Sequence, residues 1–253
     1  MTLNNETIIT WFGHSTFRID TPGGKSLLID PFLQGNPVCP EELHNPMNID
    51  AVFVTHGHFD HINDAPRIAI ANSAPVVCMF DLSDWLSGQG VEEIIGFNLG
   101  GTIEVAGVRA SMVEARHSSS LPGEDGIVYG GLAVGYILEM ENSFKIYVAG
   151  DTSLFMDMAM IGELYEPHLG ILPIGDHFTM NGQHAARACR LLGLKHVIPC
   201  HYGTFPSLAP NAEALTKAAE EIADLEVHVL KPGESLQRIS KAVKHIPPFE
   251  AEN

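Results

Sequence analysis

The sequence predicts an α/β fold in which sheets lie in the middle and helices lie outside. Short apolar runs rich in β-branched and aromatic residues recur along the chain, and turn signals separate them. The first third is mostly strand, whereas the clearest helical stretches fall between later strands. The 253 residues also match the length of one large α/β unit, so we expect residues 1–253 to form a single domain.

Each expected strand is a run of four to eight residues rich in β-branched and aromatic side chains. In chain order these strands are Thr7–Phe12, Thr16–Asp20, Ser26–Ile29, Ala51–Thr55, Pro75–Met79, Val108–Val113, Leu132–Glu139, Lys145–Ala149, Leu169–Pro173, His196–Pro199 and Glu226–Leu230. The expected helices are His184–Leu192 and Glu213–Ala223, with shorter ones near Asn63 and Asp81. The helix over 213–223 carries an apolar stripe opposite its charges.

The composition and the charge balance disfavour several classes of partner and site. Lys and Arg total 14 against 31 Asp and Glu, which gives a net charge of −17 and disfavours nucleic-acid binding. The four cysteines form no CxxC pair, so neither a cysteine metal site nor a disulfide framework is indicated. Neither a signal peptide nor a membrane span is visible, so we expect a cytoplasmic protein with no membrane partner.

Several apolar strands end directly in a side chain that can bind a metal. The residues at these ends are Asp30, His56, Asp151, Asp176 and His201. Any one of them could be an ordinary turn residue, Asp30 above all because Pro31 follows it. Together they indicate a site built at one rim of a rigid sheet.

The segment 55–61 reads Thr-His-Gly-His-Phe-Asp-His and carries the strongest functional signal. His56 and His58 are two positions apart after a strand, so they point to the same side and can bind one divalent ion. The turn that Gly57 allows brings Asp60 and His61 towards a second ion. An exposed histidine-rich loop is the alternative interpretation.

Other strand ends supply candidates to complete such a site. His117 can complete the first set, His201 can complete the second, and the two oxygens of Asp151 can bridge both ions. Taken alone, each could instead be a surface histidine or a turn carboxylate.

The pattern resembles the metallo-β-lactamase superfamily, and within it uncharacterised metal-dependent hydrolases related to ascorbate-phosphate lactonases. Besides residues 55–61, the resemblance rests on Trp-Phe-Gly-His at 11–14, Asp-Pro-Phe-Leu at 30–33, Gly-Asn-Pro at 35–37, His-Ser-Ser-Ser at 117–120, Ala-Gly-Asp-Thr at 149–152, Pro-Ile-Gly-Asp at 173–176 and Pro-Cys-His-Tyr-Gly-Thr-Phe-Pro at 199–206. It covers roughly residues 7–235.

The resemblance implies a four-layer αββα sandwich with a dinuclear metal site at one rim. It implies one ion on His56, His58 and His117, another on Asp60, His61 and His201, and Asp151 as the bridge. It also implies that His14 lies near the site. His168 and His184 stand where relatives carry acidic residues, which leaves the roles of these two histidines and an inherited substrate open.

The expected chemistry is hydrolysis by a hydroxide that bridges two divalent ions, with Asp60 or His14 as the catalytic proton shuttle. We expect zinc, with manganese, nickel or iron as alternatives. The expected substrate is a small ester, lactone or phosphodiester, and an anionic one stays open, as does a phosphate-binding role for Arg116. A role for Asp176 and a homo-oligomer stay open as well. The alternatives are an iron-dependent redox enzyme, an RNA-cleaving nuclease and a non-catalytic metal-binding module.

Overall fold

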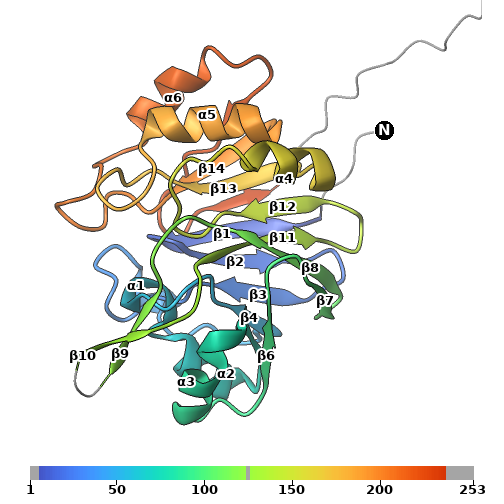
Figure 1. The fold of residues 1–253 in the computed structure, drawn as a ribbon, viewed down its shortest axis with the longest axis vertical. Helices are drawn as coiled ribbons and strands as arrows, with labels where there is room; N and C mark the ends of the chain where they lie inside the picture. Colours follow the sequence, from blue (N-terminus) through green and yellow to red (C-terminus); the bar gives the residue numbers. More distant parts are fainter. Residues whose placement is uncertain (1–5, 124–125, 238–253) are drawn as a thin grey trace, which may run out of the picture.

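Two large sheets pack face to face in the computed structural model, and helices cover both outer faces (Figure 1). The structure describes residues 6–123 and 126–237. Helices α1 to α3 lie beyond one sheet and α4 to α6 beyond the other, which confirms the predicted αββα sandwich (Figure 1). Each sheet buries one face against the other and its second face under helices.

The first sheet has the strand order β16-β1-β2-β3-β4-β5-β6. Its strands are β1 (Ile8–Gly13), β2 (Thr16–Asp20), β3 (Ser26–Ile29), β4 (Ala51–Phe53), β5 (Val76–Met79), β6 (Ile94–Phe97) and β16 (Ser235–Gln237). Strands β3 to β6 run parallel, so their carboxyl ends meet at one edge.

The second sheet has the order β15-β14-β13-β12-β11-β8-β7. Its strands are β7 (Thr102–Val105), β8 (Val108–Glu114), β11 (Val134–Glu139), β12 (Lys145–Val148), β13 (Leu169–Pro173), β14 (His196–Cys200) and β15 (Glu226–Val227). Strands β12 to β15 are parallel, which again gathers carboxyl ends at one edge.

The helices are short, and a separate hairpin projects from the sandwich (Figure 1). The helices are α1 (Phe59–Ile62), α2 (Ala65–Asn72), α3 (Ser83–Gly88), α4 (Met158–Tyr165), α5 (Gly182–Leu192) and α6 (Glu213–Ala219), with single 3-10 turns at Glu41–Leu43 and Phe80–Leu82. The hairpin pairs β9 (Ser120–Gly123) with β10 (Gly126–Tyr129). Within the described ranges, no helix is long and apolar enough to cross a lipid bilayer.

The predicted strands coincide with observed ones, but several observed strands were not predicted. The sequence missed β6, β7, β9, β10, β16 and the helix α4. Strand β7 is a short stretch in which polar and apolar residues alternate, and all four residues of β10 are exposed. The expected strand over 226–230 is only Glu226–Val227, and the expected helix over 213–223 ends at Ala219.

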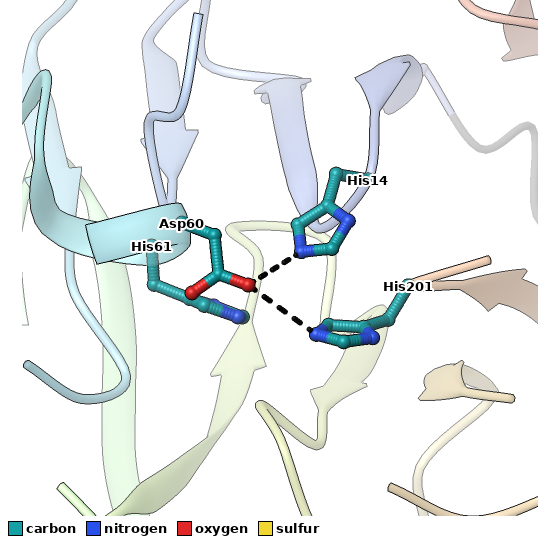
Figure 2. Close-up of side chains that lie close together, drawn as sticks. All are labelled: His14, Asp60, His61 and His201. Atoms are coloured by element: carbon teal, nitrogen blue, oxygen red, sulfur yellow. Dashed lines mark hydrogen bonds and ion pairs between the residues drawn. The ribbon is translucent and has the colours of Figure 1, made fainter. Parts of the chain in front are cut away.

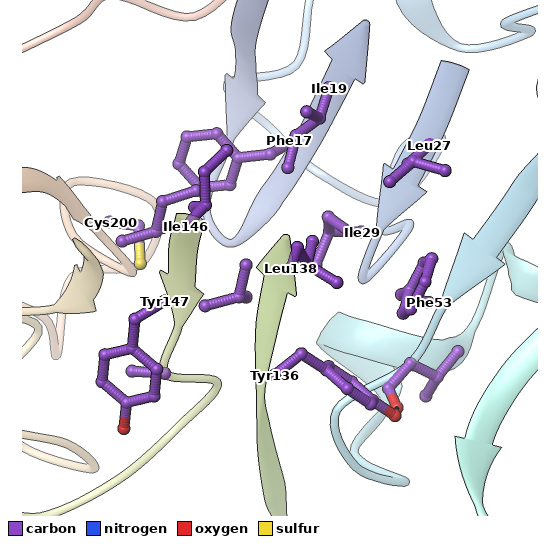
Figure 3. Packing of buried hydrophobic residues seen from close by; sticks show 14 of the residues in the cluster. Phe17, Ile19, Leu27, Ile29, Phe53, Tyr136, Leu138, Ile146, Tyr147 and Cys200 are labelled. Carbon is purple, nitrogen blue, oxygen red and sulfur yellow. Dashed lines mark hydrogen bonds between the residues drawn. The ribbon is translucent and has the colours of Figure 1, made fainter. Parts of the chain in front are cut away.

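The core lies between the two sheets, where side chains of both interdigitate (Figure 3). Phe17 and Ile29 of the first sheet and Leu138 and Ile146 of the second are fully buried there. Tyr136 is also buried, and its hydroxyl donates to the carbonyl oxygen of Val54 at 2.8 Å, which satisfies its polar atom. The packed sheets form a rigid base for the loops that leave the strand ends.

Candidate metal centre

The candidate centre forms where strands of both sheets end at the same rim. His14 follows β1, Asp30 follows β3 and His201 follows β14, each at a positive φ of 54°, 44° and 57° respectively. Side chains other than glycine rarely adopt this backbone region, and such residues gather at functional sites.

His201 also depends on a close approach of the neighbouring loop. A Cβ atom at Gly175 would lie 2.3 Å from the carbonyl oxygen of His201 and 2.9 Å from its Nδ1. Only glycine therefore allows the loop after β13 to pack against this imidazole.

The first group of side chains consists of His56, His58 and His117. His56 Nε2 lies 3.0 Å from His58 Nδ1, and the ring of His117 lies 5.2 Å from that of His56 and 5.0 Å from that of His58. The potential ligand atoms of these three imidazoles, which follow β4 and β8, lie within 4.8 Å of one another.

The second group consists of His14, Asp60, His61 and His201 (Figure 2). Asp60 lies on α1, and its Oδ2 is 3.0 Å from His14 Nε2 and 3.7 Å from His201 Nε2. His14, which no metal-ligand spacing marked, is completely buried and lies within the group.

Asp151 lies between the two groups. Its Oδ2 is 2.9 Å from His201 Nε2, 3.4 Å from His61 Nε2 and 3.6 Å from His117 Nε2. One carboxylate is therefore within reach of imidazoles from both groups.

Asp30 orients the imidazoles of His61 and His56 through hydrogen bonds on the side away from the centre. Its Oδ2 accepts hydrogen bonds from His61 Nδ1 at 2.8 Å and from the Thr55 hydroxyl at 2.7 Å. The hydroxyl oxygen of Thr55 in turn accepts from His56 Nδ1 at 3.0 Å. These partners place the proton of each ring on Nδ1, which leaves both Nε2 lone pairs facing the centre.

Burial keeps the first group unprotonated near neutral pH. It is the largest cause that lowers the pKa of His56, His58 and His117 below the ordinary value for imidazole. Burial likewise lowers the pKa of His14 to about 4, although the hydrogen bond to Asp60 opposes it. Unprotonated imidazole is the form that binds a metal.

The two histidines nearest Asp151, His61 and His201, have raised pKa values. Burial would lower the pKa of His61 and His201, but the Asp151 carboxylate outweighs it and raises the pKa of His201 to about 9. Burial would raise the pKa of Asp151 and Asp60, but neighbouring histidines hold both well below their usual range. Buried carboxylates that stay ionised favour cations between them.

The donor set fits a divalent transition metal. Asp151 Oδ1 and His61 Nε2 are buried and make no hydrogen bond within the part of the chain that the structure describes. The potential ligand atoms in each group lie within 4.8 Å of one another. Imidazole nitrogen with carboxylate oxygen is a typical zinc ligand set, and both of these atoms could bind such an ion.

Arg116 and Asp176 belong to neither group of potential metal ligands. The exposed guanidinium of Arg116 pairs with Glu114 at 3.0 Å and Asp157 at 3.3 Å, and lies over the ring of Phe155. Asp176 also follows its strand but is exposed.

His168 and His184 lie in other surroundings. His168 Nδ1 accepts a hydrogen bond from the backbone of Lys145 and stacks on Phe144, while His184 is exposed in the first turn of α5. Neither joins the histidine groups at the rim.

The hydroxyl groups of Thr204 and Ser119, which contact the histidine segments, were not predicted from the sequence. The Thr204 hydroxyl lies 3.0 Å from His14 Nδ1, and the Ser119 hydroxyl accepts from the backbone of Gly57 at 3.1 Å. Thr55 directly precedes His56 and could have been noticed there, whereas single Ser and Thr residues elsewhere carry no distinctive spacing.

Comparison with known proteins gives relatives along most of the chain. Residues 25–202 match the family model described as a beta-lactamase superfamily domain. A UPF0173 metal-dependent hydrolase from Rubrobacter xylanophilus is 50% identical over 91% of this chain and 96% of its own, and one from Roseiflexus castenholzii is 49% identical over 93% and 99%.

A solved structure of a metallo hydrolase is also similar to this chain over most of its length. Igni18, described as a novel metallo hydrolase from the archaeon Ignicoccus hospitalis, has 33% identity and a TM-score of 0.80, with 94% of this chain and 99% of that chain covered. The chain therefore belongs to the UPF0173 family of metal-dependent hydrolases, within the beta-lactamase superfamily.

Proposed function

We propose that the protein hydrolyses a small ester or lactone with two divalent ions held at the sheet rim. The observation that carries this proposal is the position of Asp151, whose Oδ2 lies 3.6 Å from His117 Nε2 and 2.9 Å from His201 Nε2. A carboxylate within reach of both histidine groups is suited to bridge two cations.

The proposed ligands divide into two sets that share Asp151. One ion binds to His56, His58 and His117, and the other to Asp60, His61 and His201. We expect zinc, with manganese, nickel or iron as alternatives, because imidazole binds all of these. Bound ions of this kind lower the pKa of a shared water to near neutrality and polarise the substrate oxygen.

Asp60 and His14 form the proposed proton shuttle. The Asp60 side chain is 14% exposed, whereas His14 is completely buried, so Asp60 is the member that can meet a leaving group. His14 donates from Nε2 to Asp60 Oδ2 and accepts at Nδ1 from the Thr204 hydroxyl, which fixes the orientation of both side chains. Asp60 would deliver the proton, and His14 would position Asp60.

The surroundings favour an uncharged substrate over a phosphate. Phe59 is 57% exposed and packs with Phe32 and Phe205 at ring distances of 5.8 and 6.5 Å, which gives the Asp60 side of the centre an aromatic rim. Arg116 is held by Glu114 and Asp157, so its charge is already compensated. A small ester or lactone with an apolar part fits this rim, and a phosphodiester is the second candidate.

A hydrolysis screen of the metal-loaded protein tests the proposal. It compares lactones, short aryl esters, phosphodiesters, an RNA oligonucleotide and a β-lactam, with His58→Ala as the inactive variant and His184→Ala as the matched control. We expect turnover of an ester or lactone that His58→Ala loses and His184→Ala keeps. A coloured, reductant-sensitive protein with no hydrolysis in any arm would instead indicate redox chemistry.

A further inference from the structure

A second cluster of potential metal ligands lies at the far end of β14 from His201. It consists of His196, Glu226 and His228. His196 is the first residue of β14, so about 16 Å of strand separates it from the candidate centre. The cluster is therefore independent of the hydrolytic site.

The local strand geometry brings the three side chains to one face. His196 and Glu226 are direct partners in the parallel pairing of β14 with β15. His228 is two residues beyond Glu226, and its backbone N–H donates to the carbonyl oxygen of Val197 at 2.8 Å, which continues the pairing. Residues two apart on an extended chain share a face, so all three meet.

The distances suit a single ion. His196 Nδ1 lies 3.1 Å from His228 Nε2 and 3.5 Å from Glu226 Oε2. Ligand atoms about 2.0–2.1 Å from a tetrahedral zinc ion lie roughly 3.3 Å from one another. Both separations from His196 are close to that value, and the ligand atoms of all three residues lie within 4.8 Å of one another, so a small movement of the exposed Glu226 carboxylate completes the set.

The electrostatics suit a cation as well. Burial is the main cause that lowers the pKa of His196 and of His228, so both rings are unprotonated at neutral pH. Two neutral imidazoles and one carboxylate give the cluster a net charge of about −1. The Glu226 side chain is 66% exposed while the two imidazoles are 13% and 12% exposed, so the cluster opens to solvent on the carboxylate side.

We propose that His196, Glu226 and His228 form a peripheral binding site for one divalent transition metal ion, with zinc preferred. Two imidazoles favour zinc, nickel or copper over magnesium or calcium, which prefer oxygen ligands. The ion spans β14 and β15, whose ladder contains only two residue pairs, His196 with Glu226 and Val197 with Val227. Its role is structural: it ties the short strand β15 to the sheet.

Equilibrium dialysis against buffered zinc, followed by elemental analysis, tests this site in the full-length protein with its candidate centre loaded. The proteins compared are the wild type, His196→Gln, His228→Gln and the control His184→Gln, which removes an exposed histidine outside the cluster. We expect the two cluster variants to bind one zinc ion fewer per chain than the wild type and the control. Equal zinc content in all four proteins would overturn the proposal.

Two further measurements separate metal loss from misfolding. Glu226→Gln changes an exposed side chain, so the fold stays intact, and we expect it to weaken the same binding event. Additional zinc should raise the Tm of the loaded wild type and of His184→Gln, but not that of His228→Gln, because a ligand that binds only the folded state stabilises it. An equal rise in Tm for all variants would contradict the assignment.

Discussion

Asp30 Oδ2 lies 2.8 Å from Nδ1 of His61, and the same oxygen accepts the Thr55 hydroxyl at 2.7 Å. A single buried carboxylate thus orients His61 directly and His56 through Thr55. Both imidazoles present their Nε2 atoms to the centre as a result. Such supporting hydrogen bonds are a recurrent feature of histidine metal sites.

Asp30→Asn should weaken metal binding about 10- to 100-fold, the usual effect of removing a supporting carboxylate. The asparagine keeps one acceptor but loses the charge that favours the Nδ1–H form of His61. Titration with a competing chelator measures the affinity. Asp176→Asn is the matched control, because Asp176 also follows a strand at a positive φ of 69° yet is exposed. Equal affinities for the two variants would refute the role of Asp30.

His58→Ala and Asp151→Ala should each reduce turnover by at least about 100-fold, because each removes a ligand from a centre that the reaction needs. Cys200→Ala should retain most of the activity. Cys200 directly precedes His201, but its thiol packs into the core (Figure 3). Steady-state kinetics with parallel metal analysis distinguishes the cases, and metal loss in Cys200→Ala as complete as in His58→Ala would show that the second ligand set is wrong.

The candidate site could be predicted from the sequence better than the edge strands of the fold could. Motif 55–61 and the strand ends at Asp151 and His201 were visible because apolar strands run directly into ligand-type residues. Helix α4 was missed because its apolar residues, which include the exposed Met160, do not define one clean stripe. Thr204 was missed because its contact with His14 joins residues 190 positions apart, which no local spacing reports.

Thr204→Val should lower kcat more than it raises KM. The substitution removes the hydroxyl at 3.0 Å from His14 Nδ1 but keeps the volume of the side chain. His14 then loses the contact that fixes its orientation towards Asp60, while the proposed metal ligands keep their positions. Thr204→Ser should restore kcat because it returns the hydroxyl. If serine and valine variants had the same kcat, the hydroxyl would have no positioning role.

Activity should rise with pH through a pKa of roughly 7, the value for water at a catalytic zinc ion. At lower pH a further loss of activity should appear, because protons compete with the metal for the imidazoles. Burial lowers the pKa of His56, His58 and His117, so these ligands resist protonation until the pH falls below the ordinary imidazole range. Added zinc should restore the activity lost through protonation of the imidazoles, but not the activity lost through protonation of the metal-bound water. A profile that zinc leaves unchanged at every pH, with metal content falling, would contradict this account.

Metal content and turnover measured on the same samples during exhaustive chelation and stepwise reloading test the central claim most directly. The His228→Gln background removes the peripheral site from the count. We predict that turnover disappears with the metal and returns in full when two ions per chain have bound. Full turnover after elemental analysis has established the absence of metal would instead show that the histidine and aspartate side chains carry out the hydrolysis without an ion.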